Sequence, residues 1–192
     1  MNTFKIIFIT AATIIVEACS GSYDVTRLDD NDIPHTSTIA VAFFQAPSAD
    51  ISRIVTSALL SQLKQYGYTL VVPPEEVDKV LLENNMDLYR NPTSSTIFAA
   101  GQRIGSRYLI TGNVQNWEGG YYGLTGQRLT KVGFSFRMYD FRTGKELWIA
   151  YGEDDEGCSL FGVHSLPGEM VEGMIPKLLK DTTLKPAENA RK

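Results

Sequence analysis

Strand-type and helix-type segments alternate along residues 37–181, and their order constrains the fold more than any other feature of the chain. The first segment, Thr38–Phe44, is apolar on both sides, which is typical of a central strand covered on two faces. Apolar residues then recur every three or four positions over Ile51–Tyr66, which predicts a helix that ends at Gly67. We expect Asp50 to cap this helix at its amino end.

The rest of the domain continues the same alternation. The expected elements are a short strand at Thr69–Val72, a helix from Glu75 to about Asn84, a helical unit between Asn91-Pro92 and Gly105, strands at Tyr108–Trp117, Val132–Asp140 and Glu146–Asp154, and a helix over Pro167–Asp181. The tight turn Arg142-Thr143-Gly144-Lys145 joins the last two strands. This order, β-α-β-α-α-β-β-β-α, predicts a single α/β domain, a sandwich in which helices pack on one mixed sheet. Residues 182–192 are expected to be a loose tail.

Residues 1–18 have the layout of a secretory signal peptide. Lys5 is the one positive side chain before an eleven-residue apolar run, Ile6–Val16, whereas a membrane-spanning helix needs about 20 such residues. The run ends at Val16-Glu17-Ala18-Cys19-Ser20, which resembles a bacterial lipobox except for the glutamate at a position that is usually small and uncharged. We therefore expect Cys19 to carry lipid, with palmitate among its acyl chains. The alternative is a plain secretory signal followed by an ordinary cysteine.

A serine after the lipidated cysteine favours the outer membrane, with the domain on its periplasmic face. Residues 19–36 are expected to form a lipidated tether, because they are polar and acidic and show no periodicity. The seventeen residues after Cys19, 20–36, would reach roughly 60 Å at full extension.

The composition argues against several classes of function. The net charge is −4 and Lys and Arg do not cluster, which argues against nucleic acid as a partner. Two His and two Cys leave little material for a metal site, and the four glycines between Gly119 and Gly126 precede a strand, where phosphate-binding loops precede a helix. Cys158 and His164 are close enough in sequence to form the thiol–imidazole pair of a hydrolase, but a packed cysteine and a surface histidine are the simpler interpretation. We expect no catalytic residues, no metal and no cofactor.

The predicted segments, taken in order, resemble the periplasmic domain of the curli-type secretion lipoproteins, the CsgG superfamily. In size and form the chain resembles the smaller Pel polysaccharide-export lipoproteins (PelC) of that group. The best match is Gly105–Val114, with the letters GSRYLITGNV, which is similar to the family pattern "GA.YLI.G.V". The other matching stretches are Ile39–Phe44, Leu59–Val72, Glu75–Leu81 and Val132–Leu147.

Pore-forming members of this superfamily insert two long hairpins into the bilayer, and each such hairpin needs about 20 residues plus a turn. Only the fourteen residues 118–131 separate the corresponding strands here, and four of them are glycines. The resemblance therefore implies a non-catalytic outer-membrane lipoprotein that forms a homo-oligomeric ring without its own pore. It implies a role in guiding a secreted polymer, such as the exopolysaccharide of a biofilm, toward a separate outer-membrane pore protein.

A second reading is an activator of peptidoglycan synthases, which share a similar small α/β domain. Such an activator has to reach an inner-membrane enzyme through the cell wall, and a tether of this length counts against it.

Two groups of residues are candidate contact sites for such a protein. Trp117, Tyr121 and Tyr122 crowd the short connection between two strands, where an aromatic tip could enter lipid headgroups; packing of Trp117 in the core is the alternative. The acidic run Glu153, Asp154, Asp155 and Glu156 could line the aperture of a ring. A cation held by these carboxylates and a merely solvated charge run are the alternatives.

Overall fold

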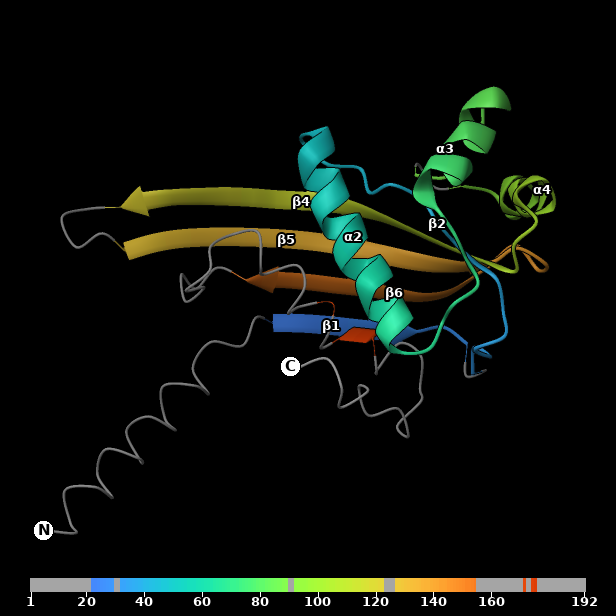
Figure 1. Ribbon diagram of the computed structural model, residues 1–192, viewed down its shortest axis with the longest axis horizontal. Coiled ribbons are helices and arrows are strands. Elements are labelled where there is room, and N and C mark those ends of the chain that lie inside the picture. Colours follow the sequence, from blue (N-terminus) through green and yellow to red (C-terminus); the bar gives the residue numbers. More distant parts are fainter. Residues whose placement is uncertain are drawn as a thin grey trace, which may run out of the picture.

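The structure is a computed structural model and describes residues 22–29, 32–89, 92–122, 127–154, 171 and 174–175. It confirms the mixed α/β domain, with a six-stranded sheet in the order β1-β6-β5-β4-β2-β3 (Figure 1). Strands β2, β3 and β4 are parallel to one another, and β4, β5, β6 and β1 form an antiparallel series. The elements of the described residues are β1 (Ser22–Arg27), β2 (Ile39–Val41), α2 (Ala49–Gln65), β3 (Val71–Val72), α3 (Pro74–Glu83), α4 (Ser94–Ile104), β4 (Tyr108–Tyr122), β5 (Gln127–Asp140) and β6 (Lys145–Asp154).

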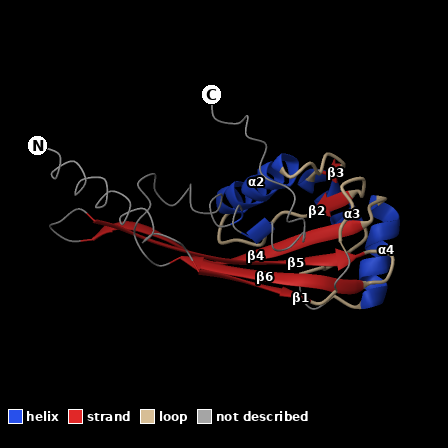
Figure 2. Ribbon diagram, turned by 90° about the horizontal axis from the view of Figure 1, so that it is seen from below, coloured by secondary structure: helices blue, strands red, loops and turns tan. Residues whose placement is uncertain are grey.

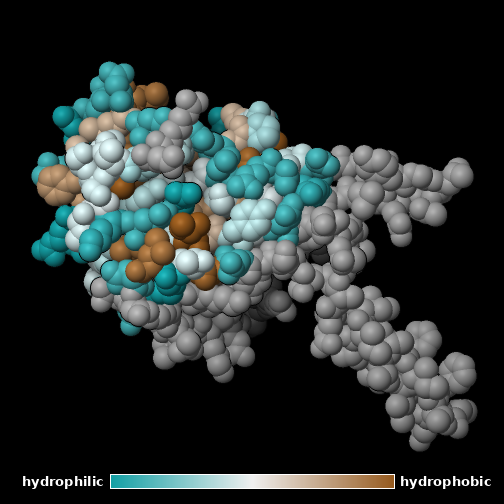
Figure 3. All heavy atoms as spheres, turned by 180° about the vertical axis from the view of Figure 1, so that it is seen from behind, coloured by the Kyte–Doolittle hydropathy of each residue, from teal (hydrophilic) through white to brown (hydrophobic). Residues whose placement is uncertain are grey.

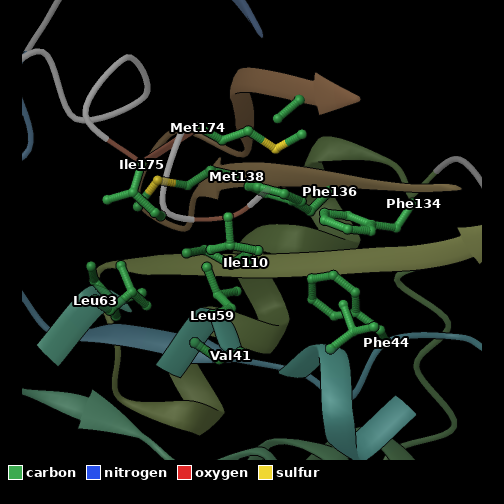
Figure 4. Packing of buried hydrophobic residues seen from close by; sticks show 14 of the residues in the cluster. Val41, Phe44, Leu59, Leu63, Ile110, Phe134, Phe136, Met138, Met174 and Ile175 are labelled. Atoms are coloured by element: carbon green, nitrogen blue, oxygen red, sulfur yellow. The ribbon is translucent and has the colours of Figure 1, made fainter. Parts of the chain in front are cut away.

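Helices lie on both sides of the sheet, and Figure 2 shows α2 along one face and α3 and α4 gathered at one end. Successive strand residues face opposite ways, so Ile110 belongs to the buried cluster beneath α2 while its neighbour Leu109 belongs to a second cluster beneath α3 and α4. The cluster beneath α2 is the larger, and Figure 4 shows Leu59 and Leu63 of α2 facing sheet residues such as Ile110. Phe136 meets the fully buried Trp148 edge to face, with ring centroids 5.5 Å apart.

The helix boundaries follow local signals. The α2 helix begins earlier than expected, because the hydroxyl of Ser48, and not Asp50, caps it by accepting a hydrogen bond from the Ile51 N–H at 3.3 Å. At the end of α4, Gly105 adopts a left-handed conformation (φ 72°), which confirms the predicted exit at that glycine.

The prediction of an unstructured tether over residues 19–36 is wrong for Ser22–Arg27. These six residues form β1, which pairs antiparallel with β6 at the edge of the sheet, with Ser22 opposite Glu153. Val25 packs against the larger cluster, and the following segment is also held, because Ile33 is buried and its carbonyl accepts a 2.8 Å hydrogen bond from the Tyr68 hydroxyl. The described part of this segment therefore belongs to the folded domain.

The loop expected over residues 118–131 is mostly strand. β4 and β5 stay paired from Glu118 opposite Lys131 to Tyr122 opposite Gln127, and residues 123–126 lie outside the described residues. Figure 1 shows this hairpin running well beyond the helices. The glycines did not end the strands, because each strand supplies the other with hydrogen-bond partners that local propensity does not register.

The predicted C-terminal helix can be judged at three positions only. Val171, Met174 and Ile175 are helical and fully buried in the larger cluster, where Figure 4 shows Met174 and Ile175 beside Met138. The rest of Pro167–Asp181 lies outside the described residues.

Candidate functional surface on the open face of the sheet

One face of the sheet is covered by helices at one end only, and the remainder is polar. In β4, Ile110 and Val114 point into the larger cluster, whereas Thr111 and Asn113 lie on the opposite side. We call this uncovered side the open face. Its polar residues are Thr111, Asn113, Gln115, Lys131, Ser135, Arg137, Tyr151 and Glu153. Figure 3, which views the molecule from behind, shows hydrophilic residues there together with a hydrophobic patch.

A hollow of about 170 Å³ lies where the open face meets the segment after α3. We call it the central hollow. Its lining residues are Gln45, Leu88, Tyr89, Thr111, Gly112, Asn113, Gln115, Ser135, Arg137 and Tyr139. A shallower hollow of about 430 Å³ shares Arg137 and Tyr139 and extends toward Ser94 of α4 and Lys145 of β6. The two hollows therefore meet at Arg137 and Tyr139.

The charges at this junction are paired within the chain. Arg137 Nη1 lies 3.5 Å from Glu146 Oε1, and the glutamate side chain is the more buried of the two. Burial raises the pKa of Glu146, and the neighbouring guanidinium opposes that rise. Burial, and then the charge of Glu146, raises the pKa of Tyr139, so its hydroxyl is neutral at pH 7 and can act as a donor or an acceptor.

One wall of the central hollow is fixed by Tyr89. Its hydroxyl donates a 2.8 Å hydrogen bond to the carbonyl of Phe43, which ties the segment after α3 to the chain after β2. Burial raises the pKa of Tyr89, and the nearby charge of Asp78 raises it further. Burial also raises the pKa of Asp78, against the lowering effect of a hydrogen bond from the Phe43 backbone. This wall is therefore held by partly buried hydrogen bonds.

The end of the open face nearest the hairpin carries a second polar network, centred on Glu153. Its carboxylate lies 3.1 Å from Lys131 Nζ and accepts hydrogen bonds from Asn116 Nδ2 at 3.1 Å and from the Tyr151 hydroxyl at 3.0 Å. The hydrogen bonds from Lys131 and Tyr151 lower the pKa of Glu153. The Glu153 side chain therefore stays partly exposed to solvent but already contacts three neighbours within the chain.

The other predicted site residues are placed as follows. Asp154 ends β6 opposite Val132, and Asp155 and Glu156 lie outside the described residues, as do Cys19, Cys158 and His164. Trp117 is half-buried and packs against the larger cluster, while Tyr121 and Tyr122 form the last residues of β4. Roles for the acidic run and for the two tyrosines stay predictions.

The open face was missed at the sequence level, although a signal for it is present. Ile110, Gly112 and Val114 alternate with Thr111 and Asn113 in β4, and this period-two pattern marks one strand face as polar up to the irregularity between Val114 and Asn116. The pattern in β4 does not predict that Tyr89 forms one wall of the central hollow, because Tyr89 is distant from β4 in sequence. Chemically, the central hollow offers neutral amides and hydroxyls beside the guanidinium of Arg137.

Two further observations concern the described residues alone. They contain no group of three or more His, Cys, Asp or Glu side chains arranged to hold a metal ion. Among them, none of the helices has both the length and the apolar character needed to cross a bilayer.

The fold is similar to that of two solved proteins. The PelC dodecamer from Paraburkholderia phytofirmans overlaps with a TM-score of 0.58 at 19% identity, over 83% of this chain and 98% of PelC. Lipoprotein GNA1162 from Neisseria meningitidis overlaps with a TM-score of 0.53 at 20% identity, over 75% of this chain and 99% of that protein. At these identities the likeness defines a shared fold.

The remaining comparisons add no family. The LpoB C-terminal domain from Escherichia coli reaches a TM-score of only 0.44 at 11% identity, over 75% of this chain and 94% of that domain, so it lends no support to the activator reading. No family model matches the chain, and no curated protein matches it in sequence.

Proposed function

We propose that this chain is a non-catalytic lipoprotein of the CsgG type that forms a homo-oligomeric ring on the periplasmic face of the outer membrane and assists the export of a polymer, most simply an exopolysaccharide. The observation that carries the proposal is the overlap with dodecameric PelC across 98% of that chain. The sequence supports the proposal with a segment that has the layout of a signal peptide and with a lipobox-like motif at Cys19. A separate outer-membrane pore is the partner that such a ring requires.

The geometry around β1 supports a particular orientation on the membrane. Only residues 20 and 21 lie between Cys19 and β1, so a lipid on Cys19 would sit at the very start of that strand. Ser22 pairs with Glu153 near the end of β6, and the β4–β5 hairpin extends from this same end of the sheet. The lipid and the hairpin tip with Tyr121 and Tyr122 therefore share one end of the domain, which we propose faces the membrane.

The short connection to β1 also weighs against the synthase activator. An anchor that reaches the enzyme through the cell wall needs a long flexible segment, and the seventeen residues counted from the sequence would have given roughly 60 Å. With β1 beginning at Ser22, the free connection from Cys19 spans about 10 Å. Only melting of the edge strand would restore the longer reach.

A deletion strain of the native host tests the export role. We expect loss of the chain to abolish polymer at the cell surface while polymer accumulates inside the envelope, with wild-type protein restoring secretion. A strain that synthesises no polymer at all would place the protein upstream of export. Unchanged surface polymer together with altered cell-wall cross-linking would favour the activator and contradict the proposal.

A further inference from the structure

We propose that neighbouring copies of this chain join through the two edges of the sheet, with Leu28 at the β1 edge of one subunit packed against Leu70 at the β3 edge of the next. This inference rests on the proposed ring, and it names the two surfaces that close it. The partner at each edge is a second copy of the chain.

Both edges of the sheet are open within the described part of the chain. The strand order leaves β1 and β3 outermost, where β1 pairs only with β6 and β3 only with β2. Figure 2 shows these two strands on opposite sides of the sheet. A ring of identical subunits needs two different surfaces on each subunit, one for the preceding copy and one for the following copy. The two edges meet this requirement, because an unpaired strand edge is a template on which another chain can pack.

Each edge carries an exposed leucine. Leu28 directly follows β1 and is 55% exposed, and Leu70 directly precedes β3 and is 50% exposed. Beside Leu70, the valines Val71 and Val72 are half-buried, so the β3 edge presents a short apolar strip, Leu70–Val72. Single exposed leucines are common on protein surfaces. The matching positions of Leu28 and Leu70 in the sheet set these two apart.

Leu28 and the apolar strip lie at nearly the same height along the strands. One row of paired residues crosses the sheet through Val72, Ala40, Leu109, Tyr139 and Glu146. The carbonyl of the next residue in β6, Leu147, accepts a 2.8 Å hydrogen bond from the Leu28 N–H, so this row ends at Leu28. Leu70 is two residues from Val72, which is roughly 6–7 Å along the strand. Rotation about a ring axis parallel to the strands keeps each residue at its height, and Leu28 of one copy then comes level with the strip of the next.

The sides and directions of the two edges also agree. Val25 of β1 and Val71 of β3 both pack against the larger cluster. Leu28 and Leu70 are each an odd number of residues from these valines, so both project on the other side of the sheet. The antiparallel series from β4 to β1 gives β1 the direction opposite to β4, β2 and β3. In a ring whose copies all stand the same way up, β1 therefore lies antiparallel to the β3 of its neighbour.

Paired cysteines test this contact in the full-length chain purified in detergent. The parent carries Cys158→Ser, and the test variant adds Leu28→Cys and Leu70→Cys. Five strand spacings, about 24 Å, separate the two edges of one sheet, whereas a disulfide needs Cα atoms within about 7 Å. The two introduced cysteines of one subunit therefore cannot bridge each other, and a bridge between them joins two copies.

We expect oxidation, or a bismaleimide much shorter than the sheet is wide, to give a ladder of covalent oligomers on non-reducing denaturing gels. The parent and the two single-cysteine variants should stay monomeric on the same gels. No ladder from an assembly that light scattering shows to be intact overturns the inference and leaves the ring standing. Cross-linked dimers from either single-cysteine variant mean that like edges meet, which also overturns it. A monomeric wild-type chain overturns the ring and this contact together.

Point variants measure the strength of the same contact. Leu28→Asp and Leu70→Asp should each raise the concentration at which the ring dissociates at least about tenfold, because a carboxylate would lose water against apolar neighbours. Both side chains are already half exposed in the single subunit, so the melting temperature of the dissociated chain should stay the same. Phe98→Asp, at an exposed position of α4, is the matched control and should leave the ring unchanged. Equal dissociation by the wild type and both leucine variants overturns the inference.

Discussion

Removal of β1 tests whether the residues next to Cys19, the proposed lipidation site, are part of the folded domain. We compare a chain that begins at residue 20, which keeps β1, with a chain that begins at residue 29, which lacks it. Both lose the lipid anchor. Only the second leaves β6 as an unpaired edge, because β1 is its partner on that side.

Two contributions set the size of the effect. Val25 is half-buried against the larger cluster, and half the burial of a valine side chain is worth about 1 kcal/mol. The six opposed residue pairs of β1 and β6 add roughly 0.2–1 kcal/mol each. The expected loss is about 2–7 kcal/mol, a large share of the roughly 5–15 kcal/mol typical of a domain. It corresponds to a melting temperature lower by about 5–25 °C.

Scanning calorimetry measures the melting temperatures, and light scattering reports aggregation through the exposed edge. Val25→Thr, which keeps the strand pairing and removes part of the apolar contact, is the matched point variant and should cost about 1 kcal/mol. If the chain from residue 29 melts within about 2 °C of the chain from residue 20 and stays dispersed, β1 contributes nothing. Residues 19–36 would then act as the tether that their composition suggests.

Three further outcomes follow from the residues described above. Cys19→Ala should abolish fractionation with the outer membrane; a variant that still fractionates there has its anchor elsewhere. Glu153→Gln should lower stability at pH 7, because Lys131 lowers the pKa of the wild-type carboxylate and its contribution is present above the unfolded value of 4.5; the difference should vanish in urea titrations as the pH falls through the lowered pKa. Gly112→Ala should cost about 1–3 kcal/mol in the same assay, because its Cβ would lie 2.5 Å from the Phe44 ring; an unchanged midpoint would contradict the packing described.

The acidic run at residues 153–156 affects stability in a way that the sequence alone did not predict. From the sequence, four adjacent carboxylates predict self-repulsion, so neutralising them should leave stability unchanged or slightly higher. The strand register instead brings Lys131 of β5 against Glu153 of β6, a pairing between residues 22 positions apart. Glutamine at position 153 is therefore expected to destabilise the domain, and no local pattern carries that information.

Local signals predicted the helices and the central strands well. The apolar periodicity of α2 and the glycine exit of α4 depend on neighbours within a few residues, which is why they could be read from the sequence. β1 was missed because Val25 is the one residue among its described side chains (24–27) that packs against the core, and its pairing depends on β6, more than 100 residues away. The hairpin was missed because glycine lowers strand propensity locally, while the pairing of β4 with β5 decides the outcome.

The candidate surface also has one feature that the sequence predicts and one that depends on the folded structure. The polar face of β4 could have been predicted, because the alternation of Thr111 and Asn113 with Ile110, Gly112 and Val114 is visible in the sequence. The central hollow could not have been predicted from the sequence. It forms because the covering helices stop short of the strand centres and because the Tyr89 hydroxyl bonds to the Phe43 carbonyl, 46 positions away. The polar face of β4 follows from a two-residue period, whereas the central hollow depends on a tertiary contact.

The mass of the purified, lipidated chain in detergent tests the central claim most directly. At high micromolar concentration, mass photometry or light scattering should give one discrete species whose protein mass is a multiple of the protomer mass, which is 21.3 kDa before the proposed removal of a signal peptide. The same species should form without added cofactor or metal. A monomer that persists at that concentration, both in detergent and after transfer to lipid, would contradict the ring.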